Sequence, residues 1–381
     1  MRCIYLDYNA STPVAPEVAA ILREGLAGAF GNPSSRHWAG APARDLVEIA
    51  RRQVADLLGC MPEEVVFTSG GSEANNFALK GTFFASSRER RHIISSRIEH
   101  PAVVEPLRFL ERLGAQITWL PVDGAGLIDP DELRRAITAD TILISIMHAN
   151  NEVGTIQPIA ACAAIAREHG IPFHTDAAQS VGKIPTHVDD LGIDLLTIAG
   201  HKLYAPKGIG ALYVRDGLSL EPLIHGAGHE RGRRAGTESA LLTAALGQAC
   251  ALVADLAAME RVKALRDRLW AGIEARFGSN VALNGHPERR LPNTLNASFI
   301  GRIGAEVLAA LEDVAASTGS ACHAGKIELS PVLAAMDVAP HVGMGAVRFS
   351  LGRETTADDI DAVIAMLNAL DPAETGAAPL A

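Results

Sequence analysis

The chain has 381 residues, of which 48% are apolar and 20% are charged, and its formal net charge is −10. Since domains average roughly 150 residues, this length predicts about two domains, and the composition excludes disordered, collagen-like and coiled-coil proteins. No basic tract stands out, so nucleic acid is not an expected partner.

The five cysteines are scattered and form no CxxC pair, which predicts neither a zinc site nor a disulfide framework and favours a reducing compartment. The N-terminal sequence MRCIYLDYNAST lacks the apolar segment of a signal peptide. The longest apolar stretch without charges, residues 239–254, is too short to span a bilayer. We therefore expect a cytoplasmic protein with no membrane partner and no metal site.

In the first two thirds of the chain, short apolar runs alternate with helical patterns such as residues 159–169. This alternation predicts βαβ units, a mostly parallel sheet and helices on both of its faces. Ligands of such sheets bind outside the carboxyl ends of the strands, so residues that directly follow a strand are the candidates for a site. The predicted strands cover residues 65–68, 91–95, 116–120, 142–147, 172–175, 195–198 and 209–214.

The pattern changes after about residue 240. A long helical stretch with a break covers residues 240–277, and a segment rich in Pro, Gly and Asn follows it at 284–293. We predict a large domain over residues 16–258 and a smaller α/β domain built from residues 1–15 and 259–381. Residues 9–16 are interpreted as a connector and residues 371–381 as a frayed tail.

A glycine turn separates the strand predicted over residues 65–68 from a helix, in the sequence TSGGSEANN. Backbone N–H groups at the start of a helix favour a phosphate, which makes Gly71 and Ser72 candidate ligands. The alternative is an ordinary capped turn with Ser72 as the helix N-cap. The turn alone does not decide between them.

Asp176 directly follows the strand predicted over 172–175, and Lys202 follows the one over 195–198. An acid in this position can hold the protonated ring nitrogen of a pyridine cofactor, and a lysine can form a Schiff base with its carbonyl. Each also has an ordinary interpretation, Asp176 as a helix N-cap and Lys202 as a solvated surface lysine. Together with the phosphate turn, they match what pyridoxal 5′-phosphate (PLP) needs from a protein.

Over residues 5–367 the sequence resembles the cysteine desulfurases of the nitrogen-fixation and iron–sulfur-assembly type, within the class V aminotransferase family. The resemblance rests on ordered motifs: YLDYNASTP, GNPSSRH, VVFTSGGSEANN, EHPAV, MHANNEVGTIQP, HTDAAQSVGK, GHKLYAPKGIGALY, GHERGRRAGTE, RLPNTLN, STGSACHAG and VRFSLGRETT. It implies a PLP-dependent transferase fold of type I, whose large domain carries a mostly parallel seven-stranded sheet. It also implies L-cysteine as substrate, a homodimer, and a sulfur-acceptor protein such as an iron–sulfur scaffold.

The resemblance assigns the cofactor site residue by residue. It implies that Lys202 carries PLP, that Asp176 pairs with the ring nitrogen and that Gln179 bonds the ring oxygen. His100 would stack on the ring and assist proton transfer; without the motif, a packed core histidine would be the preferred interpretation.

The remaining implied contacts are to the phosphate and the substrate. Gly71, Ser72 and His201 would hold the phosphate, and Thr237 would reach the phosphate of the neighbouring subunit. Asn151 would touch the ring or the substrate. Arg348 would bind the substrate carboxylate, for which a planar guanidinium is suited; its alternative is a surface salt bridge.

Cys322 lies in a stretch of small residues, which we interpret as a mobile loop of the small domain at about residues 317–330. His323 and Lys326 are close in sequence, a setting that favours the reactive thiolate. The position matches the persulfide-forming cysteine of the resembled family, so Cys322 is the expected nucleophile.

The sequence departs from the family pattern in three places. Ala199 replaces a hydroxyl or thiol residue, which leaves the affinity for PLP open. His323 follows the cysteine, as in selenocysteine lyases, so a lyase is the alternative function. The tail after Leu367 lacks the extension that grips an iron–sulfur scaffold, which leaves the sulfur acceptor open. Other class V reactions and a catalytically silent binding subunit fit less well, because Cys322 and the cofactor residues are all present.

Overall fold

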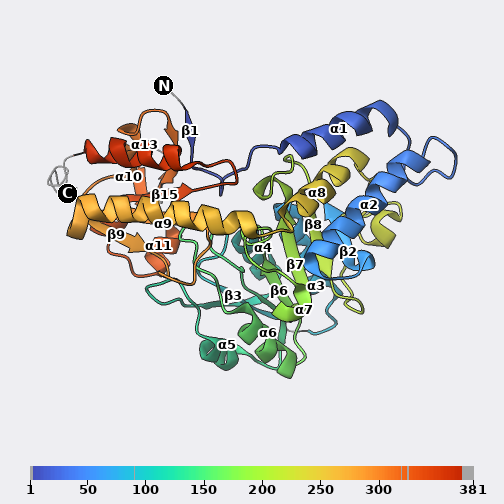
Figure 1. The fold of residues 1–381 in the computed structure, drawn as a ribbon. Helices are drawn as coiled ribbons and strands as arrows, with labels where there is room; N and C mark the ends of the chain where they lie inside the picture. Colours follow the sequence, from blue (N-terminus) through green and yellow to red (C-terminus); the bar gives the residue numbers. More distant parts are fainter. Residues whose placement is uncertain (1–2, 90, 319, 324–325, 371–381) are drawn as a thin grey trace.

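A computed structural model describes residues 3–89, 91–318, 320–323 and 326–370 of the chain. Figure 1 shows a large part built around a central sheet and a smaller part formed mainly by the C-terminal third, with the long helix α9 (Ala257–Phe277) along the smaller part. The first strand, β1 (Ile4–Tyr5), lies in the smaller part, where it pairs in parallel with β11 (Val314–Ala315).

The central sheet has seven strands in the order β2-β8-β7-β6-β5-β3-β4. The pairs β4–β3, β3–β5, β5–β6 and β6–β7 are parallel, and β8 is antiparallel to both of its neighbours. The predicted mostly parallel seven-stranded sheet is therefore confirmed. The strands are β2 (Val65–Thr68), β3 (His92–Ser96), β4 (Gln116–Leu120), β5 (Thr141–Ser145), β6 (Phe173–Asp176), β7 (Leu195–Ala199) and β8 (Gly210–Val214).

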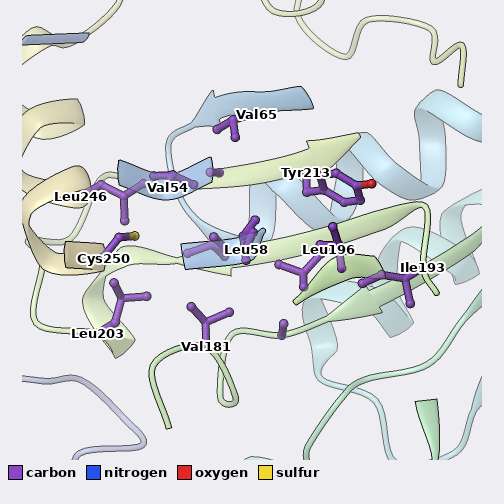
Figure 2. Packing of buried hydrophobic residues seen from close by; sticks show 14 of the residues in the cluster. Val54, Leu58, Val65, Val181, Ile193, Leu196, Leu203, Tyr213, Leu246 and Cys250 are labelled. Carbon is purple, nitrogen blue, oxygen red and sulfur yellow. The ribbon is translucent and has the colours of Figure 1, made fainter. Parts of the chain in front are cut away.

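Helices cover both faces of this sheet. Because successive side chains of a strand point to opposite faces, neighbouring strand residues pack into different cores. Leu196 lies in the core under α2 and α8, whereas Leu195 lies in the core under α3 and α4. Figure 2 shows Leu58, Leu246 and Cys250 on the helix side of the first core, facing the sheet. The helices are α1 (Pro16–Gly28), α2 (Ala41–Leu58), α3 (Gly71–Ala85), α4 (Pro101–Glu111), α5 (Pro130–Ala136), α6 (Ile159–Glu168), α7 (Val188–Leu191) and α8 (Ala240–Val253).

The smaller part has its own core and its own sheet, in the order β12-β15-β10-β9. Leu6 and Leu269 pack in this core with Phe349. This core is separate from those beside the central sheet, and the domain boundaries stay a prediction. The elements are β9 (Val281–Asn284), β10 (Thr294–Phe299), α10 (Gly304–Ala309), β12 (Ser317–Thr318), α11 (Pro331–Ala335), α12 (Pro340–Gly343), β15 (Ala346–Ser350) and α13 (Ala357–Asn368).

The predicted helical stretch over residues 240–277 breaks between α8 and α9, as expected. Within the described residues, no single helix is long and apolar enough to cross a membrane. In the part of the chain that the structure describes, α8 and α9 together are long and apolar enough, but the pair bends by 73° at the break.

The segment predicted as a loop at 317–330 is different in the structure. β13 (Ser320–His323) pairs antiparallel with β14 (Lys326–Leu329), and Cys322 is the register partner of Ile327. Small residues suggested a loop, but Lys-Ile-Glu-Leu alternates polar and apolar residues, which is typical of a strand. Residues 319 and 324–325 and the side chain of Cys322 lie outside what the structure describes, as do residues 371–381.

A buried ion pair fixes the segment that precedes Thr237. Arg51 of α2 donates to both carboxylate oxygens of Glu230, at 2.9 and 2.8 Å, and their side chains are 7% and 2% exposed. Glu230 also accepts the backbone N–H of Phe67 at 3.0 Å. Glu230 adopts a left-handed backbone conformation with φ 48°, which is unfavourable for a residue other than glycine. The ion pair with Arg51 must therefore hold this conformation in place.

Replacing Arg51 by alanine is expected to lower the free energy of unfolding by about 3–5 kcal/mol, because a buried carboxylate loses its partner. Urea unfolding measures the loss. The matched control is Arg268→Ala, which breaks an exposed pair with Asp361 and should cost no more than about 1 kcal/mol. Equal losses in the two variants would contradict the expectation.

Candidate active site

A cavity of 540 Å³ lies at the carboxyl ends of the central strands and takes residues from both parts of the molecule. Its lining includes nearly all of the predicted site residues, namely Gly71, Ser72, His100, Asn151, Asp176, Gln179, His201, Lys202 and Arg348. Thr237 lies instead on a neighbouring cavity of 250 Å³, which shares Ser69, Gly208 and Ile209 with the first. Cys322 cannot be placed relative to either, since its side chain is outside the described residues.

Helix α3 begins at the cavity and presents its free N–H groups there. Its N-cap is Gly70, with φ 151° and ψ −179°, and Ser72 lies inside the first turn. The interpretation of Ser72 as the N-cap is therefore wrong, because the glycine turn starts the helix earlier. A Cβ on Gly71 would stand 3.0 Å from the methyl group of Ala199, so glycine lets this turn approach β7 without displacing it. The arrangement suits a phosphate.

Asp176 ends strand β6 and is nearly buried at the cavity. Its carboxylate accepts hydrogen bonds from Asn75 Nδ2 at 2.7 Å and from the backbone N–H of Ala178 at 2.9 Å. It therefore stabilises a turn and a neighbouring side chain, and it does not cap a helix. Gln179 Oε1, on the same cavity, is buried without a hydrogen-bond partner in the described part of the chain, as is Asn75 Oδ1. Such unmet acceptors indicate a polar ligand.

Lys202 ends the short 3₁₀ turn η2 (Gly200–Lys202) that follows β7. Its Nζ donates to the backbone oxygens of Asn9 at 2.6 Å and Ala10 at 2.8 Å. Burial, and then the Arg348 cation, lower the pKa of Lys202 to about 8, although Asp7 acts in the opposite sense. The amine is thus available in its neutral, nucleophilic form near neutral pH, unlike a solvated surface lysine.

Two histidines flank the lysine. His100 is the N-cap of α4, and its Nδ1 accepts the N–H of Ala102 at 3.0 Å, which leaves Nε2 to carry the proton of the neutral ring. Burial lowers the pKa of His100, and burial lowers that of His201 to about 4. His100 is exposed to the cavity, so it is not a packed core histidine.

Arg348 reaches the cavity from strand β15 and is 9% exposed. Its Nη1 donates to the backbone oxygen of Asn151 at 3.0 Å, and its Nη2 donates to Asp7 Oδ1 at 2.8 Å. The alternative of a surface salt bridge is wrong, because the guanidinium is nearly buried and lines the cavity.

Residues 7–12 have a part in the site that the sequence did not predict. They were predicted as part of the small domain, with residues 9–16 as a connector, yet Asn9 lines the cavity and its backbone oxygen accepts both Lys202 Nζ and Gln179 Nε2. Glu99 was missed as well. It is fully buried beside His100, accepts hydrogen bonds from Ser96 Oγ and the N–H of Met147, and burial raises its pKa to about 8. For residues 7–12, the only signal in the sequence is a run of polar residues just after β1.

The depressed pKa of Lys202 gives a pH prediction. An amine must be neutral to attack a carbonyl, so the rate at which apoenzyme takes up PLP should rise with pH and level off above about 8. Because Arg348 lowers this pKa, Arg348→Ala should move the midpoint to higher pH. Stopped-flow absorbance measures the uptake. A midpoint near 10.5 in the wild type, the ordinary value, would contradict the prediction.

A doubly covered, mostly parallel sheet with a lysine, an acid and a phosphate turn at the carboxyl ends of its strands defines a PLP-dependent enzyme of the type I fold. The chain belongs to the class V aminotransferase family, which matches residues 4–363. The cysteine desulfurase IscS of Dictyoglomus turgidum is 48% identical over 370 residues, which cover 96% of this chain and 94% of that protein.

Solved structures agree with this family. A NifS-like protein superposes with a TM-score of 0.90 at 34% identity, covering 96% of this chain and 98% of the other. The structure of SspA in complex with cysteine gives a TM-score of 0.83 at 39% identity, covering 93% of this chain and 100% of that one.

The residues on the cavity fit PLP. The start of α3 supplies N–H donors for a phosphate, Asp176 a carboxylate for a ring nitrogen and Lys202 an amine for an aldehyde. The unpartnered Gln179 Oε1 supplies one further polar contact. Among the described residues, no three His, Cys, Asp or Glu side chains are grouped as metal ligands.

Proposed function

We propose that the protein is a PLP-dependent cysteine desulfurase that converts L-cysteine to L-alanine and passes the sulfur to an acceptor. The observation that carries this proposal is one cavity in which Lys202, Asp176 and Arg348 meet, in a chain nearly half identical to proteins named cysteine desulfurase. Selenocysteine lyase is not favoured, because the similar curated proteins carry the desulfurase name.

Each residue has a task that follows from its position. PLP, when bound, withdraws electrons from the Cα of the amino acid attached to it. Asp176, held by Asn75 and Ala178, pairs with the ring nitrogen, and Gly71, Ser72 and His201 hold the phosphate. Gln179 bonds the ring oxygen, and Asn151 touches the ring or the substrate.

Lys202, Arg348 and His100 act on the substrate. In its neutral form, Nζ of Lys202 removes the proton from the substrate Cα, and the lowering of its pKa to about 8 makes that form more abundant near neutral pH than for an ordinary lysine. Arg348 binds the substrate carboxylate with the donors that Asn151 and Asp7 leave free. His100 stacks on the ring and can exchange a proton through Nε2.

Cys322 completes the reaction. Its thiolate attacks the sulfur of the substrate, the bond between Cβ and sulfur breaks, and Cβ gains a proton. The sum is L-cysteine and a thiol on one side, and L-alanine and a persulfide on Cys322 on the other, with no external oxidant. The persulfide then passes to a sulfur-acceptor protein, for which an iron–sulfur scaffold is our first candidate.

The test is to incubate the PLP-loaded protein with L-cysteine without reductant and to follow two products. We expect L-alanine in solution and one extra sulfur on the peptide that contains Cys322, found by mass spectrometry. If L-cysteine gives neither product while L-selenocysteine gives L-alanine, the protein is a selenocysteine lyase.

We also propose a cytoplasmic homodimer. Phe30 and Trp38, between α1 and α2, are 77% and 81% exposed, and their rings stack edge to face at 6.3 Å. Two exposed aromatic residues in contact are typical of an interface. Thr237, on its own cavity, would then reach the phosphate of the neighbouring subunit.

Replacing Trp38 by aspartate is expected to weaken the dimer by more than tenfold, because interface tryptophans contribute roughly 2 kcal/mol or more. Light scattering over a dilution series measures the dissociation. The control is Met61→Asp, at a residue that is 63% exposed and outside this aromatic pair. A Trp38→Asp protein that dissociates like wild type would exclude this face from the interface.

A further inference from the structure

Asp7 contacts the cavity machinery from outside the cavity. It follows β1, forms a bridge with Ser350 of β15, and is absent from the described residues that line the cavity. A single oxygen, Oδ1, accepts Arg348 Nη2 at 2.8 Å and Ser317 Oγ at 2.9 Å. Ser317 and Arg348 are register partners on β12 and β15, so Asp7 bonds to both members of one cross-strand pair.

The donors of Arg348 divide between two sides. Nη2 binds Asp7, which lies outside the cavity, and Nη1 binds the backbone oxygen of Asn151, which lines the cavity. Nε is buried and has no hydrogen-bond partner in the described chain. A guanidinium has five N–H donors, so three remain after these two bonds, on a side chain that lines the cavity. Asp7 therefore holds Arg348 without occupying the place of a ligand.

Charge supports the same division. The side chains of Arg348 and Asp7 are only 11% and 19% exposed, so the cation would be poorly solvated without its partner. A long arginine side chain also loses conformational freedom when it binds a ligand, and a fixed guanidinium has already lost it. The pKa of Lys202 responds to both groups, since Arg348 lowers it and Asp7 raises it.

We propose that Asp7 is a positioning residue for substrate recognition: it holds the Arg348 guanidinium in the orientation that binds the substrate carboxylate. This inference rests on the role given to Arg348 in the proposed function. It predicts that loss of the Asp7 charge weakens ligands that carry a carboxylate and spares amines that lack one. An ion pair that only stabilised the fold would affect both alike.

The test is direct binding to the PLP-loaded protein, followed by the absorbance change of the bound cofactor. The ligands are L-alanine and ethylamine, which differ by the carboxylate. In Asp7→Asn, the dissociation constant of L-alanine should rise by roughly fivefold or more, the loss of one charge-assisted contact. That of ethylamine should stay within about twofold.

Two variants separate the possible results. Asp361→Asn, which removes the carboxylate of the exposed pair with Arg268, should leave both constants within about twofold. Arg348→Lys should weaken L-alanine selectively. If Arg348→Lys weakens L-alanine but Asp7→Asn does not, or if Asp7→Asn weakens both ligands equally, the proposal for Asp7 is overturned alone. If Arg348→Lys does not weaken L-alanine selectively, Arg348 does not bind the substrate carboxylate, and the proposal for Asp7 is overturned together with that role. Neither result depends on whether sulfur is released.

Discussion

Alanine in place of Lys202 should end the production of L-alanine from L-cysteine. The variant loses both the amine that joins the cofactor and the base that takes the Cα proton, and a general base alone contributes roughly 10²–10⁴-fold to the rate. The structure gives this lysine its reactivity through burial and through the nearby cation of Arg348. The rate of L-alanine formation measures the loss.

A second readout locates the cofactor. Borohydride reduction followed by peptide mass spectrometry should find PLP on the Lys202 peptide of the wild type and nowhere in Lys202→Ala. Lys202→Arg is the matched control, since it keeps the positive charge but cannot form the imine; it should be as inactive as the alanine variant. Substantial turnover in either variant would remove Lys202 from the mechanism.

Cys322→Ser should separate binding from sulfur transfer. A hydroxyl has nearly the size of a thiol but does not accept sulfur, because the thiolate is the nucleophile in this chemistry. We expect PLP content and L-alanine affinity like wild type, no extra sulfur on the peptide, and a loss of turnover on the order of that for other covalent nucleophiles, at least about 10³-fold.

The control for this variant is Cys3→Ser, which removes an exposed cysteine. It should form the persulfide on Cys322 at the wild-type rate. The three other cysteines that the structure describes are poor candidates, since burial raises the pKa of Cys60, Cys162 and Cys250 to about 12. Full activity in Cys322→Ser would show that sulfur leaves without a protein nucleophile.

The central sheet was predictable because its strands are buried on both faces. Largely apolar runs such as Val65–Thr68 and Leu195–Ala199 are typical of strands buried on both faces. The candidate site residues lie at or just after the ends of β6 and β7. Asp176 and Lys202 could be found for this reason. Their roles came from the family motifs, since either residue alone has a common structural interpretation.

The contributions of Asp7, Asn9 and Glu99 could not be predicted. Asn9 holds Lys202 through a backbone oxygen, which every residue type possesses. Asp7 acquires its partner only when β12 and β15 come together. The hairpin of β13 and β14 was missed because small residues suggested a loop, whereas cross-strand pairing decides the structure there.

The segment of residues 7–12 sets the order in which the enzyme can be assembled. A ribosome makes Asp7 and Asn9 early, but their partners Arg348 and Ser350 each come 341 positions later. The strands of the central sheet all lie within residues 65–214, and Asn9 precedes Lys202 by 193 positions, whereas the contact between Asp7 and Arg348 can form only once residue 348 has been made. Contacts this distant slow folding and prolong the exposure of unfinished surfaces. A nascent chain therefore contains every strand of the central sheet long before it contains Arg348, so the cation at residue 348 is the last part of the cavity to be made.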